Sequence, residues 1–209
     1  MNAIWYFDFI SPFAYLQLAK MRELRARIEI APVPILFGAV LKHHGQLGPA
    51  EIPGKREFTY RFVQWQAERD GIELRFPPAH PFNPIAALRL AIAAGSTWAA
   101  GTAIFEHIWK SGRSGDNAEA LADVAHALGI DDVASAISRE DVKAALRANT
   151  EAALAAGVYG VPTTRIGAEM FWGNDATPML VDWLDDADRF ATDEYRRIAE
   201  IPLGVERPR

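Results

Sequence analysis

The stretch FDFISPFA, residues 7–14, decides the fold of this 209-residue chain. It joins an apolar, strand-like run at residues 3–9 to a helical pattern that begins at Pro12. Ser11 followed by proline is a strong helix start, because the serine side chain accepts from an unpaired backbone N–H and proline has no N–H to satisfy. A helix start also gathers partial positive charge and free N–H donors. In thiol chemistry this position usually carries a cysteine, since the same field stabilises a thiolate.

The chain contains no cysteine, so any thiolate held at Ser11 comes from another molecule. The absence also excludes disulfides, thiolate metal sites and an internal redox pair. A net charge of −5 without a basic run argues against a nucleic-acid surface. The N-terminus lacks a basic region and a cleavage site and carries Asp8, and no run is long enough to span a bilayer. We therefore expect a cytoplasmic protein without membrane contact or a metal site.

The periodicity predicts an α/β fold in two separated halves. Residues 3–9, 12–27 and 28–33 predict a β-α-β unit, and the prolines at 32 and 34 indicate that pairing of its second strand stops there. Residues 161–166 and 169–172 predict a hairpin around Gly167-Ala168, followed by a helix from Thr177-Pro178. The two halves can form one mixed sheet.

The middle of the chain is almost wholly helical in pattern. Ser96 is expected to cap one helix there, and Asn117 to Leu128 to form another. We therefore expect residues 1–36 and 139–186 to form one domain, with residues 37–138 as an all-helical insertion. The polar tail, residues 187–209, is expected to form a surface arm.

Three motifs in this order carry a family resemblance: FDFISPFAYL at 7–16, GVYGVPT at 157–163 and EMFWGND at 169–175, with LFGAVLK at 36–42 as a fourth similar segment. The chain resembles the thioredoxin superfamily with a helical insertion, the branch of DsbA and the kappa-class glutathione transferases. Within that branch it is most similar to the 2-hydroxychromene-2-carboxylate isomerase family. The resemblance implies a thioredoxin-like fold and covers nearly the whole chain except the tail.

The resemblance implies a glutathione site around Ser11. The family places a catalytic serine where redox relatives have their first cysteine, and the glutathione thiol lies against its hydroxyl. Val161-Pro162 is then a cis peptide bond that presents the Val161 backbone to the cysteinyl part of glutathione. From the residues alone, Ser11 can equally be a plain helix cap, and Pro162 an ordinary trans-proline at the start of a strand.

The loop after the hairpin is implied to hold the γ-glutamyl end of glutathione. Its residues are Trp172, Gly173, Asn174 and Asp175. A carboxylate there can accept from the α-ammonium, and backbone N–H groups can bind the α-carboxylate. The same residues also make a good turn without any ligand.

Three further residues are implied to contact the substrate. Lys42 could neutralise a substrate carboxylate, and Phe82 with Asn83 in the proline-rich connector could border a planar ring. A solvated lysine and a core phenylalanine remain the alternatives. The adjacent His43 and His44 diverge on a helix and have no acidic partners at ligand spacing, so a solvated pair is favoured over a metal site.

The function implied by the resemblance is a glutathione-dependent isomerisation of a 2-hydroxychromene-2-carboxylate-type aromatic oxo-acid through reversible thiolate addition. Ser11 would stabilise the thiolate rather than attack. A kappa-like glutathione transferase or peroxidase is the alternative enzyme, and a non-catalytic thioredoxin-fold binding protein is the alternative of another class. The family also implies a homodimer.

Overall fold

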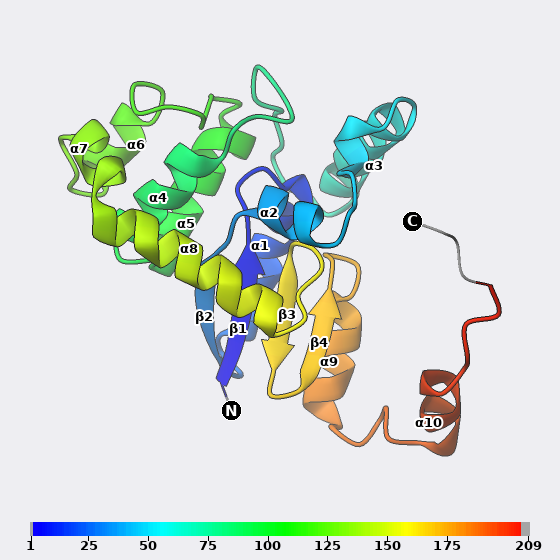
Figure 1. The fold of residues 1–209 in the computed structure, drawn as a ribbon. Helices are drawn as coiled ribbons and strands as arrows, with labels where there is room; N and C mark the ends of the chain where they lie inside the picture. The colour runs from blue at the N-terminus through cyan, green and yellow to red at the C-terminus, as the bar shows by residue number, and fades with distance from the viewer. Residues whose placement is uncertain (1, 206–209) are drawn as a thin grey trace.

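The computed structural model describes residues 2–205 and is drawn in Figure 1. Four strands form one mixed sheet in the order β2-β1-β3-β4. The central strand β1 (Asn2–Phe7) runs parallel to β2 (Glu29–Pro34) and antiparallel to β3 (Thr163–Ile166). A hairpin joins β3 to β4 (Glu169–Trp172). The expected pairing of two distant segments in one sheet is thus confirmed.

Most of the other described elements are helical. They are α1 (Pro12–Leu24), α2 (Phe37–His43), the 3-10 turn η1 (Pro49–Glu51), α3 (Lys55–Arg69), α4 (Ile85–Ala93), α5 (Trp98–Phe105), the π turn η2 (Glu106–Lys110), α6 (Ala122–Ala127), α7 (Val133–Ser138), α8 (Glu140–Ala155), α9 (Thr177–Asp185) and α10 (Asp193–Ala199). In Figure 1, α8 crosses in front of the sheet, whereas α1 lies behind it.

Alternate residues of β1 pack on opposite faces of the sheet, as a strand requires. Ala3, Trp5 and Phe7 belong to the large hydrophobic core that includes residues of α1, α4, α5 and α9. Ile4 and Tyr6 belong to a smaller cluster with residues of α2 and α8. Because both faces of β1 are covered, the strand that leads to Ser11 is fixed from two sides.

The prolines of β2 do not end its pairing, contrary to the sequence-based expectation. Pro32 and Pro34 pair in register with Trp5 and Phe7. The strand lies at the edge of the sheet, where the N–H that proline lacks would have faced away from the neighbouring strand.

Two helix boundaries also differ from the expectation. Thr97, not Ser96, caps α5, and its Oγ1 accepts from Ala100 N at 3.1 Å. Ser96 takes a positive φ of 51° instead and ends the preceding turn. The helix expected over 117–128 is reduced to α6, because residues 117–120 form turns held by Asn117 Oδ1.

The tail forms a further helix, α10, none of whose side chains is buried. Figure 1 shows α10 well separated from the sheet. Residues 206–209 of the expected surface arm lie outside the described residues.

Candidate active site

A cavity of about 460 Å³ lies where β1 passes into α1. Its walls come from the Ser11 turn, from α2 and the segment after it, from the start of α3, from the connector around His80 and from the loop before β3. The volume is in the range of small-molecule sites in proteins. Segments distant in sequence therefore meet at the predicted helix start.

Ser11 is the N-cap of α1 and lines this cavity. Its backbone is extended, with φ −89° and ψ 112°, and its Oγ accepts from Ala14 N at 3.2 Å. Within residues 2–205 the hydroxyl proton of Ser11 has no acceptor. The side chain is only 6% exposed, so that proton is available only to a group inside the cavity.

Val161 lines the same cavity as Ser11, and its peptide bond to Pro162 is cis. The Val161 N–H donates to no acceptor in the described chain. Pro162 itself is buried outside the lining, and its carbonyl accepts from Gly173 N at 2.8 Å. Ser11 and Val161 thus each carry a donor without an acceptor in residues 2–205, and both residues line one cavity.

Trp172 also lines the cavity and is 53% exposed. Its ring packs edge-on against Tyr159, with centroids 5.2 Å apart. Gly160 permits this arrangement, because a Cβ there would come within 2.3 Å of Trp172 Nε1. The indole therefore lies on the backbone that precedes Val161 and forms one side of the cavity mouth.

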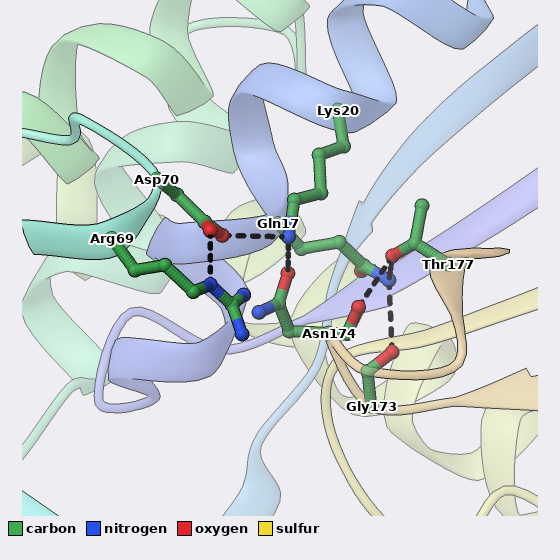
Figure 2. A network of polar contacts seen from close by, with 7 residues as sticks. All are labelled: Gln17, Lys20, Arg69, Asp70, Gly173, Asn174 and Thr177. Carbon is green, nitrogen blue, oxygen red and sulfur yellow. Dashed lines mark hydrogen bonds and ion pairs between the residues drawn. The ribbon is translucent and has the colours of Figure 1, made fainter. Parts of the chain in front are cut away.

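The rest of the predicted γ-glutamyl loop does not line the cavity. Asn174 is 2% exposed, and its Oδ1 accepts from Lys20 Nζ at 3.0 Å, while Gln17 Nε2 donates to the Gly173 carbonyl at 3.0 Å. Figure 2 shows that these contacts join the loop to α1, beside the end of α3. Asp175 is exposed. The structure therefore brings together only Trp172 of these four residues with Ser11.

Asp8 is a fully buried carboxyl in the cavity wall. Its Oδ1 accepts from Ile10 N at 3.1 Å and its Oδ2 accepts from Phe37 N at 2.8 Å. Burial raises the pKa of Asp8 to about 7, against the lowering effect of these backbone hydrogen bonds. One carboxyl thus fixes the start of α2 to the turn that carries Ser11.

His80 was not assigned a role from the sequence, yet it lines the cavity. Its Nε2 lies 2.8 Å from the carbonyl of Ile10, which can only accept, so Nε2 carries the proton. The Tyr60 hydroxyl lies 2.8 Å from Nδ1 and 2.6 Å from the His80 carbonyl, and its single proton can be donated to only one of these two acceptors at a time. Burial lowers the pKa of His80, so the ring is neutral near pH 7.

The three predicted substrate contacts are not brought together. Phe82 is half-buried and lines the cavity, whereas Lys42 is exposed and lies outside the lining. Asn83 is also exposed, and its Oδ1 accepts from Ile85 N at 3.1 Å. Lys55, at the start of α3, is the lysine that lines the cavity instead. Its place in the cavity wall depends on how α3 packs beside α2, which local sequence does not show.

Residues 2–205 contain neither a metal-binding cluster nor a membrane-spanning helix. No group of three or more His, Asp or Glu side chains in that part of the chain could hold a metal ion. None of the helices in residues 2–205 combines the length and the hydropathy needed to cross a membrane.

The site combines a capped helix start with a cis-proline, on a mixed sheet of the order β2-β1-β3-β4. These features define a thioredoxin-fold protein. Because the chain has no cysteine, it lacks a redox dithiol. The model of the DsbA-like thioredoxin domain matches residues 4–185. A 2-hydroxychromene-2-carboxylate isomerase of Pseudomonas sp. (strain C18) is 31% identical over 190 residues, covering 84% of this chain and 86% of that protein. The chain therefore belongs to the DsbA-like thioredoxin domain family and, within it, to the 2-hydroxychromene-2-carboxylate isomerases.

Two further comparisons agree with this assignment. A solved structure of a 2-hydroxychromene-2-carboxylate isomerase superposes with a TM-score of 0.78 at 27% identity, covering 93% of this chain and 99% of the other. A kappa 2 glutathione S-transferase of Caenorhabditis elegans is 25% identical over 206 residues, covering 86% of this chain and 90% of that protein.

Proposed function

We propose that this protein is a glutathione-dependent isomerase of a 2-hydroxychromene-2-carboxylate-type aromatic oxo-acid. The observation that carries the proposal is the free hydroxyl proton of Ser11, held inside a cavity at a helix start. The names of the relatives supply the substrate class. Glutathione supplies the one chemical group that the chain lacks, a thiol that can add reversibly to a conjugated carbon.

The residues of the cavity fit a thiol-bearing ligand. The Ser11 hydroxyl donates to the sulfur, and the partial positive charge at the start of α1 lowers the thiol pKa. The free N–H of Val161 fixes the ligand backbone beside it. Trp172 and Phe82 border the remaining space with aromatic rings, which suit a planar substrate. Holding thiol and substrate together supplies the rest of the rate increase.

A kappa-like glutathione transferase is the second candidate, supported by the similarity to the nematode protein. It would use the same site but leave the thiol bonded to the product. An isomerase returns its glutathione, whereas a transferase consumes one glutathione for each product. We further propose that the protein acts in the cytoplasm as a homodimer, in keeping with a chain without cysteine and with its family resemblance.

The test compares Ser11→Ala with a matched cap variant, Thr97→Ala. Each loses a side chain that accepts from the N–H three residues on, but only Ser11 lines the cavity. Both should lose about 1 kcal/mol of stability. Only Ser11→Ala should lose proton release on glutathione titration and at least about tenfold in kcat for chromene carboxylate isomerisation.

The concentration of glutathione is measured before and after turnover in the same assay. Unchanged glutathione with isomerised product supports the isomerase. Glutathione lost in proportion to product supports the transferase. If the wild-type protein binds no glutathione, both candidates are excluded and Ser11 is a helix cap alone.

A further inference from the structure

A second cavity, of about 400 Å³, lies between α2, α4 and α8. From α4 it receives Ile85 and Arg89, which are four residues apart and therefore share one helix face. The α8 residues that line the cavity lie three or four positions apart along one helix face, from Glu140 to Leu154. Three helices thus border a half-open space that the proposed isomerisation does not use.

Arg89 gives this cavity its most unusual group. Its Nε is buried and has no hydrogen-bond partner in the described chain. A buried donor without a partner costs free energy, and native structures contain few of them. The Nε itself is closed to a bound molecule, but Arg89 lines the cavity, so its terminal guanidinium nitrogens are the atoms that a bound acceptor would contact.

The charges along the wall leave an excess of positive groups. Lys143 is neutralised by Glu140, with Nζ and Oε1 at 2.7 Å. Arg89 and Arg147 form no ion pair with any residue in 2–205, and Glu151 is the remaining acid of the lining. The lining therefore holds three cationic and two anionic side chains, and Glu140 lies close enough to feel the charges of Lys143, Arg147 and Arg89.

Apart from Thr150, the rest of the wall is apolar and comes from Leu36, Ala39, Ile85, Ala144, Leu146 and Leu154. A guanidinium beside an apolar wall is complementary to a molecule with a carboxylate head and a hydrocarbon body. We propose that this cavity is a second ligand site, for a small apolar carboxylate bound by Arg89 and Arg147. The site is separate from the Ser11 cavity, because α2 lies between them and only Leu36 lines both.

The test uses phenylbutyrate and its neutral counterpart phenylbutanol as probes, on the full chain. We expect phenylbutyrate to bind at least about tenfold more tightly than phenylbutanol by calorimetry, because the charged head supplies the guanidinium contacts. Arg89→Met and Arg147→Met should each weaken phenylbutyrate binding by about tenfold. Arg113→Met removes an arginine that pairs with Asp123 outside this lining, and should leave binding unchanged.

Amide chemical shifts locate the probe. Binding at the second cavity should shift Thr150 and Leu154, which line only that cavity, and not Ser11 or Gly160, which line only the other. Arg89→Lys keeps the charge and loses Nε, and serves if Arg89→Met is poorly folded. The proposal is overturned if no probe binds, if both probes bind equally, or if the shifts fall at Ser11 and Gly160 and survive the Arg89 variants.

Discussion

Asp8 is the residue whose acid–base behaviour departs most from the ordinary. Its pKa rises from 3.8 to about 7 because the carboxyl is fully buried. A carboxyl with a raised pKa binds its proton more tightly in the folded state than in the unfolded state. Its contribution to stability is therefore complete below about pH 4 and is lost as the pH rises through 7.

The first prediction concerns Asp8→Asn, which cannot ionise. The pKa difference corresponds to about 4 kcal/mol. The free energy of unfolding of the wild-type protein, relative to that of the variant, should fall by about this amount between pH 4 and pH 8. Urea unfolding at several pH values measures it. A difference between the two proteins that does not change with pH would show that Asp8 titrates normally.

A second residue-scale prediction separates the two lysines proposed to contact a substrate carboxylate. Lys55 lines the cavity, whereas Lys42, which was inferred from the family resemblance, is exposed and outside the lining. We expect Lys55→Gln to raise KM for the chromene carboxylate by about tenfold without a comparable change in kcat. Lys42→Gln should leave both constants unchanged. The reverse result would favour the resemblance over the cavity geometry.

Local sequence could identify Ser11 because a helix cap is a short-range pattern. It could not identify His80, whose partner Ile10 lies 70 residues away. The contact exists only because the connector before α4 folds back over the start of α1. Long-range contacts of this kind leave no periodic signal, which is why sequence predicts the helix cap at Ser11 but not the place of Lys55 and His80 in the cavity wall.

At the scale of elements, α1 connects the Ser11 turn to the loop that follows β4. Its first residue follows Ser11, and Gln17 farther along it donates to both the Gly173 carbonyl and Thr177 Oγ1 at 3.0 Å. The Gln17 Oε1 also accepts from Trp5 Nε1 at 2.7 Å. One buried amide therefore joins β1, α1 and the loop before α9, as Figure 2 shows for the loop contacts.

The third prediction is that Gln17→Met destabilises the protein by about 2–4 kcal/mol, because Trp5 Nε1 and the Gly173 carbonyl lose their buried partner. Amide exchange should also become faster over residues 173–177. Gln64→Met is the matched control, since Gln64 is exposed and donates only to Glu68 Oε1. Its unfolding free energy should change by less than about 0.5 kcal/mol. Equal losses of unfolding free energy in both variants would show that Gln17 does not hold β1, α1 and the loop together.

The elements themselves were predictable where periodicity is strong and less so where caps compete. The strands, α1 and the hairpin follow from alternation and turn residues. The start of α5 does not follow from the sequence pattern, because Ser96 and Thr97 are both good caps and only tertiary packing selects Thr97. Pro32 and Pro34 were misjudged because a strand's place at the sheet edge is a property of the assembled sheet.

At the scale of the molecule, the helical insertion and the sheet share one hydrophobic core. Phe105 of α5 packs on Phe9 with ring centroids 4.6 Å apart and on Phe7 at 5.4 Å. Trp109 Nε1 donates to the Phe9 carbonyl at 2.8 Å, and Trp98 Nε1 donates to the Ile30 carbonyl at 2.8 Å. The division of the chain into two domains, with boundaries at residues 36 and 139, stays a prediction. The continuous core leads us to expect that both parts unfold together.

The fourth prediction follows from that core. Phe105→Ala should cost about 3–5 kcal/mol, since it opens a cavity between α5 and β1. Far-ultraviolet circular dichroism, which follows the helices, and tryptophan fluorescence should report one coincident transition before and after the substitution. Phe58→Ala on α3 is the control, because Phe58 is 60% exposed and its loss should cost less than about 0.5 kcal/mol. If the fluorescence and dichroism transitions separate, the insertion unfolds as a domain of its own, and the shared aromatic contacts do not couple it to the sheet.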